Sequence, residues 1–247
     1  MIPNPIRKVL STMEARQVRV LLMGGQACVF YGAAEFSRDV DFAILTGAEN
    51  WQRLQSALMD LQAECIAVPP CDMDYLLRGF ALHFRCQHEE ARGLRIDVMS
   101  VMRGVEAFPK LWERRASLAD AAGTVYNLLS LPDLVQAKKT QRSRDWPMIQ
   151  RLVDTDYMVG RESPSPNQIA FWLRELRTPQ YLIEHAARHA EASLQLSSRR
   201  PLIKRAIDGD VAALTAGLAE EEKEEREQDR IHWQPLKAEL ERLRHAK

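Results

Sequence analysis

The pattern of apolar and polar residues predicts strands and helices that alternate along the first half of the chain. Five segments have the short apolar runs or the strict alternation that is typical of strands. They are residues 18–23, 37–44, 79–86, 94–101 and 125–130. Apolar residues recur at helical spacing in three further segments, residues 4–16, 26–31 and 48–62. Residues 88–93 lie between two of the strands and predict a hairpin connection.

The second half of the chain is predicted to be helical. Pro132 suits the first turn of a helix, which we expect to run through Lys138 and Arg142, and another helix follows at residues 145–157. Residues 160–166 have the Gly, Ser and Pro content of a linker. The expected fold is therefore α/β (α+β), with a small mixed sheet flanked by helices in residues 1–160. A helical C-terminal region is expected in residues 167–247.

Composition is that of an ordinary globular protein. The 247 residues are 46% hydrophobic and 28% charged. No apolar run approaches the ~20 residues that span a bilayer, and the first residues lack the pattern of a signal peptide. We therefore expect a cytoplasmic protein that makes no membrane contact. The four cysteines have neither C-x-x-C nor zinc-finger spacing and are predicted to be free thiols.

Charge gives no sign of a nucleic-acid or membrane surface. Lys and Arg total 34, as do Asp and Glu, so the formal net charge is zero. No overall field attracts the protein to a polyanion, although composition leaves a local basic patch open.

Two carboxylates stand out in the second predicted strand. Asp39 and Asp41 are two positions apart, so they point to the same face, whereas Val40 and Phe42 point to the other. Neighbouring carboxylates repel each other unless a cation lies between them. The pair therefore predicts a cation site, and a solvated edge strand is the alternative.

A third acid and a glycine pair complete the pattern. Asp97 is a lone acid in an apolar strand, and it would join the other two acids if its strand lies beside theirs. Otherwise it is a surface or capping acid. Gly24 and Gly25 follow a strand and precede a helix, where backbone N–H groups can face an anion. The alternative for the glycines is a purely structural turn.

Taken together, these residues resemble the DNA polymerase β-like nucleotidyltransferase superfamily. The similarity covers roughly residues 15–105: Gly24-Gly25, then Phe36-Ser37-Arg38-Asp39-Val40-Asp41, then a later strand with Asp97. Residues 131–138 and 142–146 also look like the helical segment of small AbiEii-like (abortive-infection) and toxin-type members. The resemblance makes residues 1–160 the expected nucleotidyltransferase domain.

The resemblance implies a reaction and a role for each matched residue. It implies transfer of NMP from an NTP to a hydroxyl of a protein, a tRNA or a small molecule. Two Mg²⁺ ions are expected, with Mn²⁺ as the alternative, and a cognate antitoxin or other partner protein is implied by the toxin-type members. The implied metal ligands and catalytic residues are Asp39, Asp41 and Asp97. The implied nucleotide-binding residues are Gly24, Gly25, Ser37, Arg38, Lys138 and Arg142.

The helix predicted after Pro132 offers independent support. Lys138, Arg142 and Asp145 would share one face of it, where the two cations can meet a phosphate. An ordinary solvated face with an internal ion pair is the alternative.

The sequence also departs from the family pattern. Glu35 stands where small members often have arginine, and Gln26 follows the second glycine where serine is expected. These departures leave a second hypothesis open, a catalytically degenerate protein that binds a nucleotide or a partner. A helical adaptor with no metal dependence is a third.

The histidines give weaker signals. His185 and His189 are predicted to lie at the surface of a helix, and His83 has no evident partner.

Overall fold

The computed structural model describes residues 4–119 and 123–245, which form two compact units. The first unit comprises the chain up to Phe30, Ala34–Ala137 and the residues from His232. The second comprises Tyr31–Ala33 and Lys138–Ile231. The predicted linker at residues 160–166 lies between two helices of the second unit, and the division into domains 1–160 and 167–247 stays a prediction.

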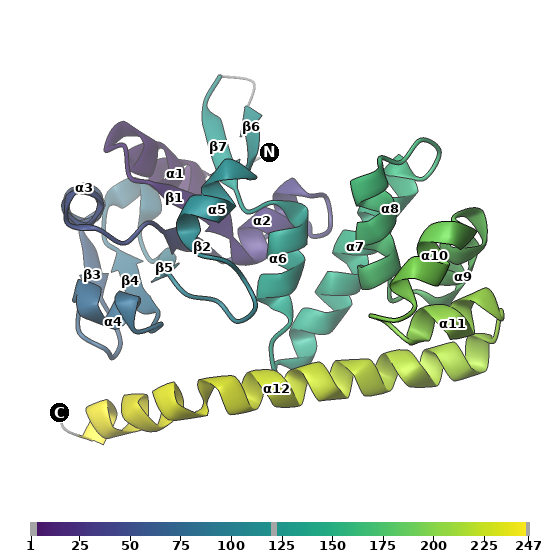
Figure 1. The fold of residues 1–247 in the computed structure, drawn as a ribbon. Coiled ribbons are helices and arrows are strands. Elements are labelled where there is room, and N and C mark those ends of the chain that lie inside the picture. Colours follow the sequence, from purple (N-terminus) through teal and green to yellow (C-terminus); the bar gives the residue numbers. More distant parts are fainter. Residues whose placement is uncertain (1–3, 120–122, 246–247) are drawn as a thin grey trace. The chain divides into compact units, whose positions relative to one another are not determined.

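The first unit contains a seven-stranded sheet with helices around it (Figure 1). Its strands are β1 (Val20–Met23), β2 (Asp39–Ile44), β3 (Ala63–Cys65), β4 (Leu82–Cys86), β5 (Arg95–Met99), β6 (Ala116–Ala119) and β7 (Val125–Leu128). Its helices are α1 (Asn4–Ala15), α2 (Gly24–Phe30), α3 (Ala48–Asp60), α4 (Met73–Leu77), η1 (Glu89–Ala91), α5 (Phe108–Glu113) and most of α6 (Leu131–Lys138). All five predicted strands are present, although each is shorter than expected at one or both ends. The strands β3 and β6 were not predicted.

The sheet is mixed, as predicted. Its strand order is β3-β4-β5-β2-β1-β7-β6. Strand β2 runs parallel to β5 and antiparallel to β1. Strands β4 and β5 form the predicted hairpin, and β1 runs parallel to β7. The acid-bearing strands β2 and β5 are therefore neighbours near the middle of the sheet.

One face of the sheet forms the apolar core of this unit. Val40 and Phe42 on β2 are 0% and 1% exposed, and Ile96 and Val98 on β5 are fully buried. Helix α1 lies on this face, where its Met13 lines the same cavity as Phe42 of β2. Burial of these side chains holds the strands in register, so the alternate residues of β2 and β5 lie on the opposite face.

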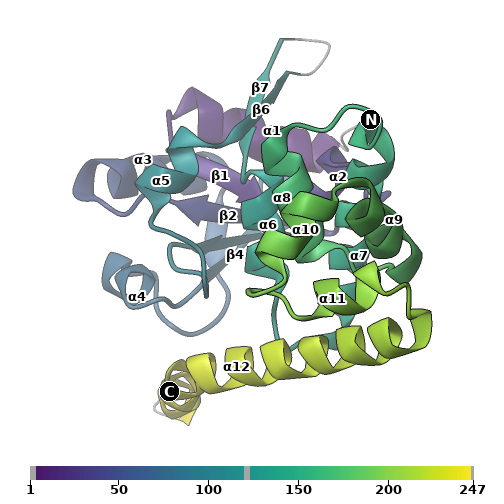
Figure 2. The ribbon, with the colours of Figure 1, turned by 45° about the vertical axis from the view of Figure 1, so that its right-hand side comes forward.

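The second unit is entirely helical, as predicted for this part of the chain. Its helices are η2 (Ser143–Asp145), α7 (Trp146–Gly160), α8 (Pro166–Glu175), α9 (Pro179–Arg188), α10 (Ala190–Leu196), α11 (Leu202–Ile207) and the part of α12 (Val211–His245) up to Ile231. Figure 2 shows α8 to α11 as short helices gathered together.

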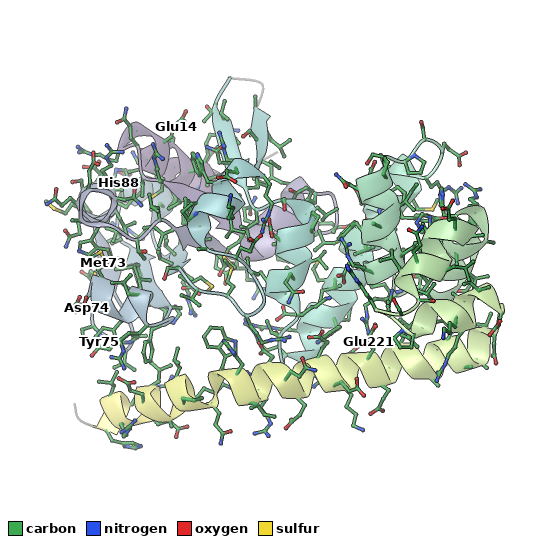
Figure 3. All side chains as sticks on the ribbon, viewed as in Figure 1. Glu14, Met73, Asp74, Tyr75, His88 and Glu221 are labelled. Carbon is green, nitrogen blue, oxygen red and sulfur yellow. The ribbon has the colours of Figure 1, made fainter. Side chains whose placement is uncertain are left out.

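A buried ion pair ties α12 to the end of α8. Arg200 is 6% exposed and donates to both carboxylate oxygens of Glu221, which is labelled in Figure 3, and to the last carbonyls of α8, those of Leu173 and Leu176. These hydrogen bonds satisfy carbonyl groups that the helix leaves without an internal donor.

His185 corrects a prediction. It is 1% exposed rather than at the surface, and its ring lies edge-on to Tyr157 and Trp172 at 5.5 and 5.3 Å between centroids. The interior accepts it because the ring Nε2 lies 3.1 Å from the carbonyl oxygen of Ile169.

The last residues of α12 belong to the first unit, where they contact the end of α4. Arg78 forms an ion pair with Glu239 and lies over the ring of Tyr75, which is labelled in Figure 3. Across the described residues, no helix combines the length and the apolar character that a bilayer crossing needs.

Candidate active site

The turn from β1 into α2 carries the predicted glycine pair. Gly24 has a φ of +64°, and a β-carbon placed on it would overlap the Asp41 carboxylate. A β-carbon on Gly25 would lie 2.6 Å from the Ser37 hydroxyl oxygen. Asp41 and Ser37 therefore pack directly against the backbone of this turn, which leaves room for no side chain but hydrogen.

Ser37 and Arg38 lead into β2. The hydroxyl of Ser37 donates to the backbone oxygen of Asp39 at 3.0 Å and lies 3.1 Å from Asp39 Oδ1. Ser37 thus fixes the start of β2 and the first acid together. The side chain of Arg38 is exposed.

Asp39, Asp41 and Asp97 lie on one face of the sheet. Asp41 and Asp97 are Cα partners on the parallel strands β2 and β5, so adjacent backbones separate them by ~4.8 Å. The predicted neighbourhood of Asp97 and Asp41 is confirmed. Asp39 lies one step along β2 on the same face, opposite Arg95.

Asp97 is the most buried of the three acids, at 8% exposed. Its Oδ1 accepts from Arg95 Nε at 2.7 Å and lies 2.9 Å from His83 Nδ1. Burial acts to raise the pKa of Asp97, but the hydrogen bonds from His83 and Arg95 outweigh it and hold the pKa below its usual range. Asp97 is therefore an ionised carboxylate at neutral pH.

His83 and Arg95 are members of this cluster that sequence reasoning missed. His83, predicted to have no evident partner, is the Cα partner of Asp97 across the β4–β5 hairpin. Its Nδ1 also lies 3.0 Å from Arg95 Nη2. A protonated Nδ1 donates to Asp97 and a bare Nδ1 accepts from Arg95, so the ring cannot make both hydrogen bonds at once. The alternation Arg95-Ile96-Asp97 was the one available signal that Arg95 shares the face of the acids.

The acid cluster offers the oxygen ligands of a divalent-cation site, but its side chains are not arranged to hold an ion. Carboxylate oxygens are the ligands that Mg²⁺ and Mn²⁺ prefer. Among residues 4–119 and 123–245, however, no group of three or more His, Cys, Asp or Glu side chains is arranged to hold a metal ion. In this structure Asp97 Oδ1 faces Arg95 and His83. Asp39 and Asp41 fit such an ion by their chemistry, and Asp97 fits it only once Arg95 moves.

Comparisons with known proteins add little to this geometry. The sequence matches no family model and no curated protein. The chain is similar to a crystal structure of a "putative nucleotidyltransferase from H. pylori", with a TM-score of 0.40 and 11% identity over 91% of this chain and 93% of that chain. A likeness of this size carries no argument about activity, and the family resemblance in the sequence stays a prediction.

The segment that follows α6 corrects a second prediction. Helix α6 ends at Lys138, so the single helix expected to run through Arg142 is wrong. The chain leaves the helix because the backbone N–H of Gln141 donates to the buried carboxylate of Asp229 at 2.9 Å. A tertiary hydrogen bond here replaces the intrahelical one.

Lys138 and Arg142 nevertheless approach the same carboxylate. Lys138 Nζ lies 3.9 Å and Arg142 Nε 3.3 Å from Asp145. The three residues are therefore grouped between the end of α6 and η2 rather than on one helix face. Both cations belong to the second unit, and their contact with a nucleotide stays a prediction.

Gln26, the departure from the family pattern, is buried just after the glycine turn. It is 1% exposed, and neither its amide oxygen nor its amide nitrogen has a hydrogen-bond partner within the described part of the chain. Such groups are rare in native interiors because they lose their hydration without a replacement.

Proposed function

We propose that this chain is a metal-dependent nucleotidyltransferase that transfers NMP from an NTP to a hydroxyl acceptor. The observation that carries the proposal is the register of Asp41 and Asp97 on adjacent strands, next to the turn formed by Gly24 and Gly25. Three carboxylates on one sheet face offer oxygen ligands to cations, and the family resemblance implies that the backbone of the glycine turn holds the triphosphate.

Each acid has a role in this proposal. Asp39 and Asp41 would hold two Mg²⁺ ions, or Mn²⁺, and Asp97 would ligate the catalytic one. When bound, these ions neutralise charge on the phosphates and align the attacking and leaving oxygens. The acceptor hydroxyl oxygen forms a bond to the α-phosphorus, and the bond to the leaving pyrophosphate breaks. Asp97 would take the hydroxyl proton.

The remaining residues would bind the triphosphate. Gly24 and Gly25 allow its close approach to the backbone, and Ser37 lies against the second glycine. Arg38 is exposed beside Asp39 and supplies a cation in place of the arginine that Glu35 replaces. The resemblance implies that Lys138 and Arg142 also contact the phosphates.

The toxin-type resemblance and the net charge both bear on the acceptor. Resemblance to toxin-type members favours a protein or a tRNA over a small molecule, and it brings in a cognate antitoxin as partner. Zero net charge argues against extensive tRNA contact, because each phosphate contact needs a cation.

A binding module without turnover is the second candidate. It is favoured by the contacts of Asp97 with Arg95 and His83, and by the lack of a three-ligand arrangement among the described residues. Such a protein would bind a nucleotide or a partner and transfer nothing.

Thermal unfolding tests the site, and labelled NTP tests turnover. The wild type and Asp39→Ala/Asp41→Ala are heated with each NTP, with and without Mg²⁺. A ligand that binds only the folded state stabilises it by about 2.7 kcal/mol at 100 times its Kd. We expect a Mg²⁺-dependent shift that the double variant lacks and that the exposed pair Glu89→Ala/Glu90→Ala retains.

The outcomes separate the two candidates. Transfer of label from an α-labelled NTP to an acceptor in a cell extract supports the enzyme. A metal-dependent shift without such transfer supports the binding module. No shift with any NTP would contradict both.

A further inference from the structure

The guanidinium of Arg95 lies beside the carboxylate of Asp97, within the acid cluster. Arg95 Nε donates to Asp97 at 2.7 Å, and Arg95 is the register partner of Asp39. The hydrogen bond to Asp97 and the charges of Asp97, Asp39 and Asp41 raise the pKa of Arg95 above its ordinary value. Arg95 therefore interacts electrostatically with every acid of the cluster.

Carboxylates this close need a positive charge between them. Like charges on one face repel, and ionised groups away from bulk water repel more strongly. Arg95, which donates to Asp97 Oδ1, is a cation that offsets this repulsion in the structure.

We infer that Arg95 occupies the cation position of the acid cluster in the metal-free chain and must leave Asp97 before a divalent ion can bind there. The inference rests on the proposed function and adds a competition within the same site. Arginine stays protonated in proteins, so it can vacate the position only by moving.

The two partners differ in their freedom to move. The side chain of Arg95 is 43% exposed, whereas that of Asp97 is 11% exposed. A long, half-exposed side chain can turn toward solvent without loss of core packing. His83 lies 2.9 Å from the same Asp97 oxygen, so the carboxylate keeps one neighbour when Arg95 departs. A divalent ion would therefore displace Arg95, while Asp97 stays in place.

Binding of Mn²⁺ alone, without nucleotide, tests the inference by electron paramagnetic resonance or calorimetry. The variants are Arg95→Gln and, as matched control, Arg85→Gln. Arg85 pairs in register with Arg95 on β4 and is exposed, so its variant removes the same charge one strand farther from Asp97. We expect Arg95→Gln to bind Mn²⁺ at least about tenfold more tightly than wild type, since a competing charge has gone. Arg85→Gln should gain clearly less affinity than Arg95→Gln, because Arg85 lies one strand farther from Asp97 and water weakens the field of an exposed charge.

If circular dichroism shows that Arg95→Gln does not fold, a second variant keeps the test decisive. Arg95→Lys retains the charge but loses the planar guanidinium, and we expect an affinity between those of wild type and Arg95→Gln. Mn²⁺ binding that is equal or weaker in the folded variants would overturn the inference. If Asp39→Ala/Asp41→Ala abolishes that binding, the proposed function survives. No Mn²⁺ binding by any variant would overturn both.

Discussion

A β-carbon on Gly24 would overlap the carboxylate of Asp41 and lie 2.7 Å from the Cβ of that residue. Gly24 also has a φ of +64°, which L-residues avoid. We therefore expect Gly24→Ala to lower the free energy of unfolding by about 2–4 kcal/mol, from backbone strain and overpacking together. Displacement of Asp41 should also remove the Mg²⁺-dependent stabilisation by NTP. Urea denaturation with and without Mg²⁺ and NTP measures both effects.

Gly93 provides the matched control for this substitution. Its φ is +80°, but a β-carbon there would meet nothing within 4 Å. Gly93→Ala should therefore show the strain alone, about 1–2 kcal/mol, and leave ligand effects intact. Equal losses of stability in the two variants would show that the contact of Gly24 with Asp41 does not matter.

Burial makes the pair of Asp97 and Arg95 more important than an ordinary surface ion pair. In Asp97→Asn the ion pair becomes a hydrogen bond from the charged guanidinium of Arg95 to a neutral amide oxygen. We expect unfolding free energy to fall by about 1–3 kcal/mol. Denaturant titration of the metal-free protein at neutral pH measures this change.

Asp60→Asn controls for the loss of an aspartate–arginine pair as such. Asp60 accepts two hydrogen bonds from Arg16, at 2.6 and 2.7 Å, but both side chains are exposed. Solvent screens that pair, so its variant should unfold close to wild type. If Asp60→Asn and Asp97→Asn lower the free energy of unfolding equally, the burial of Asp97 adds nothing to stability.

The sequence was sufficient to find the acids because each one interrupts an apolar strand. Asp39 and Asp41 in β2, and Asp97 in β5, are conspicuous against residues that pack the core. His83 was not predictable, since it meets Asp97 only through the pairing of β4 with β5, whereas alternation within β5 already puts Arg95 on the face of Asp97. The adjacency of β2 and β5 was a hypothesis that only the register could decide.

The differences from the predicted elements have two physical causes. The strands β3 and β6 are three and four residues long and mostly exposed, so they carry no apolar alternation. The early end of α6 depends on the hydrogen bond between Gln141 and Asp229, which are 88 positions apart. Helical spacing continues through that region of the sequence, and local propensity is overridden by the tertiary contact.

The buried amide of Gln26 leads us to expect that an apolar replacement stabilises the protein. Both polar atoms of its buried amide lack a hydrogen-bond partner within the described residues. Methionine has the same unbranched shape without those atoms. We expect Gln26→Met to raise the free energy of unfolding by about 1–3 kcal/mol, because an unsatisfied polar group is removed. Urea denaturation of the two proteins measures the difference.

Gln168→Met is the control with the opposite expected sign. Gln168 forms a capping box with Ser165 at the start of α8, so its amide is used. Loss of that cap should cost about 1 kcal/mol. A loss of stability in Gln26→Met as well would show that its amide is satisfied in solution.

His185 makes stability depend on pH. Burial lowers its pKa from 6.5 to about 4. Between those values the unfolded chain binds a proton that the folded chain does not, so stability falls as pH falls through this window. A shift of this size corresponds to about 3 kcal/mol by pH 4, at 1.36 kcal/mol per unit.

His185→Gln should flatten this dependence, because glutamine can donate to the Ile169 carbonyl without titrating. A residual slope is expected from His189, whose pKa burial also lowers. Urea denaturation at pH values from 4 to 7 gives the slope for each variant, and the exposed His232→Gln should retain that of wild type. If His185→Gln kept the full slope, other groups would be responsible, and the half-buried carboxyls of Asp154 and Asp156 could not supply it. Burial raises their pKa, so the folded chain keeps their protons to higher pH and they favour folding as pH falls.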